Sequence, residues 1–255
     1  MIVLPLVALD VGSWSRARFG AWEIVLALSC AAACLGFAYG LNAIAERRTD
    51  VCPRKNPLVG RPGDVPSAIL RVGAASGLAL LLAALLSSTA LVAAGTSLVA
   101  GTLYSIGARA KAKPLVGLLF NGLIFVPLCF VLYDGAHVPQ TFGCEVAIFV
   151  ALLTQNQLLH ELADRHEDHR AQATTTAQLL GETGTRWVAA SFGVVVFGAA
   201  WLLQAPRLGL ITAALLGAAT VLLCSRRDLA PSTARVLHRR LAVLGGAVLY
   251  FIGHT

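Results

Sequence analysis

The sequence is poor in charged residues. Asp, Glu, Lys and Arg make up 13% of its 255 residues, and hydrophobic residues make up 57%. Soluble domains usually carry about 25% charged residues. This shortage excludes an ordinary soluble domain and indicates an integral membrane protein that crosses the bilayer several times.

The chain also lacks cysteine motifs and low-complexity linkers. None of its six cysteines forms a C-x-x-C pair, and most lie within apolar runs. We therefore expect them to pack as small apolar residues rather than to form disulfides or metal sites. Because no Pro-, Ser- or Gly-rich linker interrupts the sequence, we predict a single domain over residues 1–255.

Nine apolar runs predict the membrane-spanning helices. Most approach the ~20 residues that a helix needs to cross a bilayer, and the two terminal runs are shorter. The predicted fold is all-α, a polytopic bundle of about nine transmembrane helices around a central cavity. The runs cover residues 2–11, 22–45, 68–87, 89–107, 114–133, 142–159, 187–205, 208–224 and 241–253.

Positive charge is concentrated on one side of this predicted topology. Seventeen of the 20 Lys and Arg residues follow the second, fourth, sixth or eighth run. The positive-inside rule makes that side cytoplasmic. The net charge of +7 is then explained by topology and by contact with anionic lipid or diphosphate, and we predict no nucleic-acid partner.

Two acidic clusters lie on this cytoplasmic side, and their carboxylates fall in the long hydrophilic stretches 46–66 and 160–186, which we interpret as loops. The first cluster comprises Asn42, Glu46 and Asp50, and the second comprises Asp164 and Asp168. Residues four apart share one face of a helix. Carboxylates beside a lipid-buried body are costly unless a partner offsets their desolvation. The clusters therefore indicate a chemical site, although ordinary charges at helix ends are the alternative.

The oxygen atoms of these clusters suit Mg²⁺ held together with the phosphates of a substrate. If the two clusters face each other, with Glu161 close by, they could hold two or three Mg²⁺ ions on a diphosphate. Nearby basic side chains could contact its non-bridging oxygens. These are Arg54, Lys55, Lys111 and Lys113.

Three histidines crowd the second cluster: His160, His166 and His169. A zinc site needs three or four convergent ligands, although His160 and Asp164 do have i, i+4 spacing. We interpret the three as loop histidines on a basic surface.

These motifs resemble those of the UbiA superfamily of intramembrane prenyltransferases, N-x-x-x-D-x-x-x-D and D-x-x-x-D. Glu46 stands where the family usually has Asp. The segment 54–60 resembles the tail of the family's first motif, and Thr175 with 179–181 resembles the ending of the second. Tyr104-Ser105, Lys111 and Pro114 resemble a third signature between the clusters.

The resemblance implies a prenyltransferase of isoprenoid biosynthesis, in which Mg²⁺ promotes ionisation of an isoprenyl diphosphate and a hydrophobic or aromatic acceptor captures the allylic cation. It implies that Asp50, Asp164 and Asp168 are catalytic. The implied Mg²⁺ ligands are Asn42, Glu46, Asp50, Asp164 and Asp168. The implied diphosphate-binding residues are Asn42, Arg54, Lys55, Tyr104 and Lys111.

Three alternative functions remain at this point. A terpene cyclase would ionise the same diphosphate and close the cation on its own chain. A phosphoribosyltransferase would use a polyprenyl phosphate as acceptor. A cation-coupled transporter is disfavoured, because transporters place polar sites near the bilayer midplane and these carboxylates lie at its cytoplasmic margin.

Overall fold

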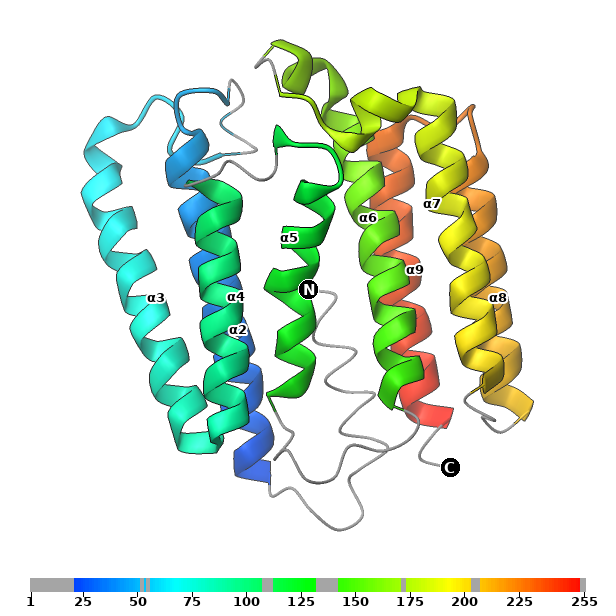
Figure 1. Ribbon diagram of the computed structural model, residues 1–255, viewed down its shortest axis with the longest axis horizontal. Helices are drawn as coiled ribbons and strands as arrows, with labels where there is room; N and C mark the ends of the chain where they lie inside the picture. Colours follow the sequence, from blue (N-terminus) through cyan, green and yellow to red (C-terminus); the bar gives the residue numbers. More distant parts are fainter. Residues whose placement is uncertain are drawn as a thin grey trace. The chain divides into compact units, whose positions relative to one another are not determined.

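Every regular element among the residues that the structure describes is a helix, which confirms the all-α prediction. This computed structural model describes residues 21–50, 53, 56–106, 112–131, 142–170, 173–202 and 207–252. The helices are α2 (Ala21–Glu46), α3 (Val65–Leu86), α4 (Ser88–Ser105), α5 (Val116–Phe125), α6 (Phe142–Arg170), α7 (Thr176–Leu202), α8 (Arg207–Ser225) and α9 (Pro231–Ile252), with the 3-10 helices η1 (Pro62–Asp64) and η3 (Val126–Phe130) (Figure 1).

Three segments are long and apolar enough to cross a membrane, namely Trp22–Glu46, Pro62–Leu86 and Phe142–Arg170. Val116–Phe130 and Leu215–Ser225 are shorter apolar helices. The first predicted span, residues 2–11, lies outside the described residues. The membrane-spanning character is therefore confirmed, and the count of about nine crossings stays a prediction.

Helix α6 corrects the expected loop at residues 160–186. The apolar run ends at Leu159, but α6 continues to Arg170, and α7 already begins at Thr176. Hydropathy reports where a helix leaves lipid, whereas Glu, Arg and His are compatible with a helix that continues into water. A further interruption lies inside α7 at Gly181, whose positive φ of 68° suits a residue without a Cβ atom.

The chain divides into two compact units, which we name by their helices. The α2–α4 unit comprises residues 20–112 and 119–137, and the α6–α9 unit comprises residues 1–19, 113–118 and 138–255. Each unit is described by itself. The organisation of the whole chain as a single domain stays a prediction.

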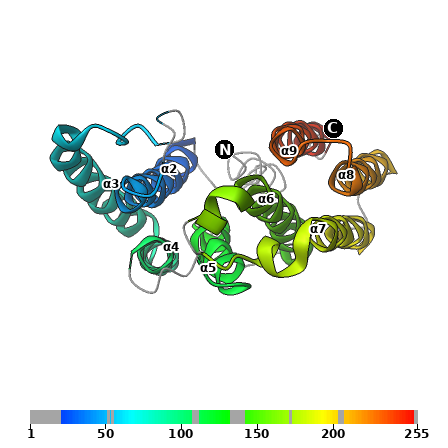
Figure 2. The same cartoon turned by 90° about the horizontal axis from the view of Figure 1, so that it is seen from above.

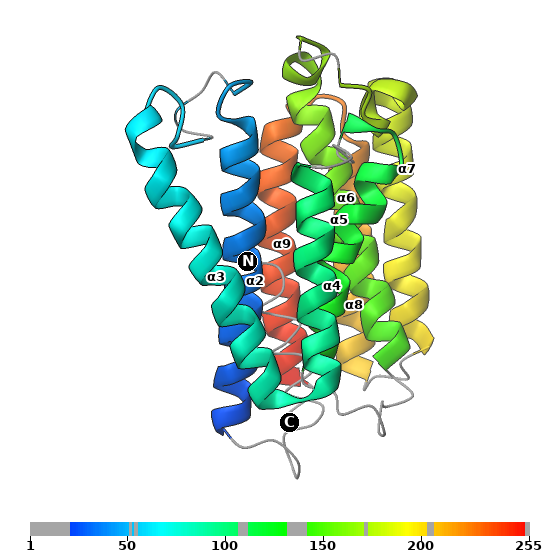
Figure 3. The ribbon, with the colours of Figure 1, turned by 60° about the vertical axis from the view of Figure 1, so that its left-hand side comes forward.

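In the α2–α4 unit, each of the three helices packs against the other two (Figure 3). Small residues allow this close packing. A Cβ atom on Gly40 of α2 would lie 2.7 Å from the Val72 side chain of α3. Ala79 and Ala83 of α3 are fully buried. Close contact between the helices of this unit thus depends on small side chains where they meet.

In the α6–α9 unit, α6 packs against α7, α7 against α8, α8 against α9, and α9 returns to α6 (Figure 2). Apolar residues of all four helices meet in one cluster that includes Leu152, Val196, Leu216 and Ala242. The unit is therefore closed around its own core.

A buried arginine holds the end of this unit together. Arg186 of α7 is only 2% exposed. Its guanidinium donates to the backbone oxygens of Arg226 and Leu229, both at 2.7 Å, and to Glu182 Oε1 at 3.0 Å. The carbonyl groups at and beyond a helix C-terminus have no partner within the helix. Arg186 therefore supplies hydrogen-bond donors, from inside the protein, to backbone carbonyl groups in the connection between α8 and α9.

We expect Arg186→Met to lower the thermal unfolding temperature of the detergent-purified protein strongly. Methionine fills similar space but leaves two partly buried carbonyl oxygens without donors, at a cost on the order of 3 kcal/mol. Arg227→Met is the matched control, because Arg227 is exposed. Equal unfolding temperatures for the two variants would contradict this structural role.

Candidate functional site

The first acidic cluster lies at the end of α2. Asn42 and Glu46 belong to its last turns, and the Asn42 amide nitrogen donates to Glu46 Oε2. Asp50 lies one turn beyond the helix, and its backbone N–H still donates to the Glu46 carbonyl oxygen at 2.9 Å. Among the described residues, the buried Oδ1 atom of Asn42 has no hydrogen-bond partner. The cluster thus presents an unsatisfied oxygen on Asn42, whose amide bonds to the Glu46 carboxylate, with Asp50 one turn further along the chain.

Asn56 fixes the position of the Asp50 carboxylate. It is 2% exposed, and its side-chain amide donates to Asp50 Oδ2 at 2.9 Å and to the Ala43 carbonyl oxygen at 2.8 Å. Its Oδ1 accepts the Leu58 backbone N–H at 3.0 Å. Sequence reasoning missed this residue as part of the site. Its only signal was its place in the segment that follows the motif.

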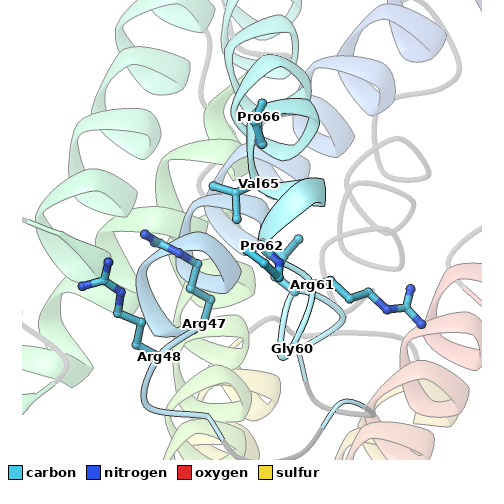
Figure 4. A pocket seen from close by; sticks show the side chains of 8 residues that line it. Arg47, Arg48, Gly60, Arg61, Pro62, Val65 and Pro66 are labelled. Carbon is cyan, nitrogen blue, oxygen red and sulfur yellow. The ribbon is translucent and has the colours of Figure 1, made fainter.

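A basic pocket of about 450 Å³ lies where α2 leads into α3. Arg47 and Arg48 extend to one side of it and Arg61 extends to the other (Figure 4). The pocket therefore attracts anions, although its guanidinium groups do not meet at one point. Its lining residues are Arg47, Arg48, Leu58, Gly60, Arg61, Pro62, Val65 and Pro66.

The second acidic cluster belongs entirely to α6, where Asp164 and Asp168 are both partly buried. His160 Nδ1 lies 3.1 Å from Asp164 Oδ2. The interpretation of the histidines as loop residues is therefore wrong for all three, because His160, His166 and His169 are part of α6. The helix continues through all three histidines, so the side chains of His160 and Asp164, one turn apart, lie next to each other.

Glu161 has a structural contact. This buried carboxylate accepts the backbone N–H of Ala177 at 3.1 Å, in the first turn of α7, and the Gln157 amide at 3.5 Å. A carboxylate at a helix N-terminus satisfies one of its free N–H groups and complements its dipole. Glu161 thus joins α6 to the start of α7, close in sequence to the catalytic candidates.

The remaining predicted residues are only partly described. Tyr104 lies in the last turn of α4 and is half-buried. Lys113 is exposed. Arg54, Lys55 and Lys111 lie outside the described residues. The first cluster belongs to the α2–α4 unit and the second to the α6–α9 unit. Across the residues that are described, no three His, Cys, Asp or Glu side chains form a group that could hold a metal ion.

Comparison with known proteins shows the family to which this helical chain belongs. The model of the UbiA prenyltransferase family matches residues 2–252. The chain belongs to this family. The resemblance seen in the two motifs is thereby confirmed, and with it the membrane-embedded helical fold.

Solved structures of UbiA homologues share this fold at low sequence identity. A homologue from Archaeoglobus fulgidus, bound to DMAPP and Mg²⁺, is 19% identical, with a TM-score of 0.72 over 98% of this chain and 94% of that one. A homologue from Aeropyrum pernix K1 is 17% identical, with a TM-score of 0.77 over 97% and 94%. A digeranylgeranylglyceryl phosphate synthase is 11% identical, with a TM-score of 0.75 over 99% and 93%. A search of curated proteins finds no match.

We expect Asn56→Leu to free the segment that carries Asp50. The variant keeps the size of the side chain but removes three hydrogen bonds, so amide hydrogen exchange in peptides covering residues 47–60 should accelerate about tenfold or more. Thr49→Val is the control, because it removes one exposed hydroxyl bond from the same turn. Unchanged exchange in Asn56→Leu would show that Asn56 does not hold Asp50.

Proposed function

We propose that this UbiA-family protein is a Mg²⁺-dependent prenyltransferase that moves an isoprenyl group from an isoprenyl diphosphate to an apolar or aromatic acceptor. The observation that carries this proposal is the unsatisfied Oδ1 atom of Asn42, buried beside Glu46 and preceding Asp50. A buried acceptor without a donor is costly in water-poor surroundings, and a cation would satisfy it.

The donor set of both clusters fits Mg²⁺. All proposed ligands offer oxygen: Asn42, Glu46, Asp50, Asp164 and Asp168. Magnesium is usually bound through one or two carboxylates, with substrate phosphates and water completing its coordination. A protein site of this kind therefore needs no group of three acidic side chains.

The chain's own groups have distinct tasks in the proposed reaction. Bound Mg²⁺ would neutralise the diphosphate as its bond to the allylic carbon breaks. Arg54, Lys55, Tyr104 and Lys111 are proposed to contact the diphosphate oxygens, with bidentate contacts available to arginine. The acceptor then bonds to the allylic carbon and, if it is aromatic, releases a proton.

Two further observations support an isoprenyl diphosphate as the donor and a position of the active site at the cytoplasmic side of the membrane. The homologue from Archaeoglobus fulgidus has been solved with DMAPP and Mg²⁺ and with GPP and Mg²⁺. In this chain, Arg47, Arg48 and Arg61 lie next to the first cluster in sequence and surround the pocket at the end of α2. By the positive-inside rule, we place the active site at the cytoplasmic side.

We expect Asp50→Asn and Asp164→Asn each to abolish turnover of DMAPP or GPP while the unfolding temperature stays near that of the wild type. Loss of a metal ligand should cost more than the ~10- to 100-fold typical of an outer partner. Asp64→Asn, an exposed change in η1, should leave activity unchanged. Chelation of Mg²⁺ should stop the wild type, and addition of Mg²⁺ should restore it.

The acceptor distinguishes transfer from cyclisation. We expect mass spectrometry to detect a prenylated product only when an apolar or aromatic acceptor is supplied with the diphosphate. A cyclic hydrocarbon formed from the diphosphate alone would replace the proposed transfer with a cyclase reaction.

A further inference from the structure

A strained turn lies directly before α5, in the part of the chain that belongs to the α6–α9 unit. Among the described residues, Leu115 is the only residue other than glycine with a positive φ, at 60°. The Val116 backbone N–H donates to the Pro114 carbonyl oxygen at 2.6 Å, which closes a three-residue turn around Leu115. Such a turn with a positive φ at its centre is rare and strained. A residue with a Cβ atom adopts it only when the surrounding structure imposes it.

The hydroxyl group of Thr176 is one of the contacts that impose this conformation. Thr176 is the first residue of α7 and is 2% exposed, and its Oγ1 accepts the Leu115 backbone N–H at 2.9 Å. Two other contacts hold the same segment. The Gly117 N–H donates to the Lys113 carbonyl oxygen at 3.1 Å, and Leu118 packs against an apolar cluster of the α6–α9 unit. The turn is therefore docked on this unit by both polar and apolar contacts.

The same end of α7 also binds the helix of the second acidic cluster. Ala177, the residue after Thr176, donates its backbone N–H to Glu161 Oε2 at 3.1 Å. Glu161 precedes Asp164 by three residues on α6, and residues three apart are neighbours on a helix surface. Two consecutive residues of α7 thus hold the turn that carries Lys113 and the helix that carries Asp164.

The lysine signature connects this junction with the proposed chemistry. Lys113 begins the turn, and its side chain is exposed and can reach a ligand. Lys111 lies two residues earlier, outside the described residues. Groups that stabilise developing charge act only when they are held in place before the reaction, and small displacements are costly. Strained backbone conformations also occur mainly at functional sites. A glycine at position 115 would adopt the same φ without strain.

We infer that Thr176 is a positioning residue for the diphosphate. Its hydroxyl holds the strained turn through the Leu115 N–H, and the turn fixes where the lysine side chains lie relative to Asp164 and Asp168. This inference rests on the proposed function, which assigns the diphosphate to the lysine signature. Without the hydroxyl, the Leu115 N–H would have no acceptor in the protein, and the turn could relax to a negative φ.

The first test compares Thr176→Val with Thr176→Ser in the full-length protein in detergent. Valine has the shape of threonine but no acceptor, and serine keeps the acceptor. We expect Thr176→Val to accelerate amide exchange of residues 113–118 about tenfold. The KM for GPP and the Kd of Mg²⁺-pyrophosphate should rise about tenfold, while kcat and the unfolding temperature change less. Thr176→Ser should restore all of these values. Thr183→Val, an exposed change on α7, is the control and should match the wild type.

A second pair of variants tests the turn from its exposed side. The Leu115 side chain is 64% exposed, so its substitution removes little packing. Leu115→Val should raise the KM for GPP, because a branched Cβ atom disfavours a positive φ. Leu115→Gly should keep the wild-type KM, because glycine adopts this φ without strain. Combined with Thr176→Val, it should restore the binding of Mg²⁺-pyrophosphate.

Two results would overturn the inference. In the first, Thr176→Val leaves the exchange of residues 113–118 unchanged, so the hydroxyl does not hold the turn. In the second, exchange accelerates but the KM and the pyrophosphate affinity stay at their wild-type values, so the contact is only structural. If Thr176→Val does not fold, the Leu115 pair decides, and an equal KM for its valine and glycine variants rejects the inference.

Failure of the proposed function would look different. The wild type itself would then neither turn over GPP nor bind Mg²⁺-pyrophosphate, whereas amide exchange would still report whether Thr176 holds the turn.

Discussion

Every polar side chain that α6 buries must find its partner within the protein, because lipid offers none. Gln155 meets this constraint through a carbonyl oxygen of α7 and a histidine of α9, and Glu161 meets it through the first turn of α7. These bonds hold the helices of the α6–α9 unit in one register. The position of Asp164 and Asp168 in that unit follows from this register.

The same constraint acts at helix ends in both units. Asn56 donates to a carbonyl oxygen near the end of α2 and to the Asp50 carboxylate. Arg186 donates to two carbonyl oxygens of the segment that follows α8. Single buried polar residues thus fix the segments at which the helices end. Apolar packing among small residues supports the helices between them.

Sequence periodicity predicted the helices well where apolar runs and helices coincide. The run 22–45 corresponds to α2 at Ala21–Glu46. The prediction from apolar runs failed at residues 160–170, because hydropathy marks the limit of the lipid-buried part and not the end of a helix. The shared face of Asp164 and Asp168 agrees with their common helix. The convergence of the two clusters on one ligand stays a prediction.

The sequence by itself determined the membrane class, the family and the residue types that suit Mg²⁺ and diphosphate, because composition and motif spacing are local properties. Only the tertiary structure decided which buried groups meet. The buried Gln155 of α6 and His238 of α9 are 83 residues apart, and no local pattern pairs them. Their contact depends on how α9 packs against α6, since the burial of each polar group is stabilised by a partner brought from a distant part of the chain.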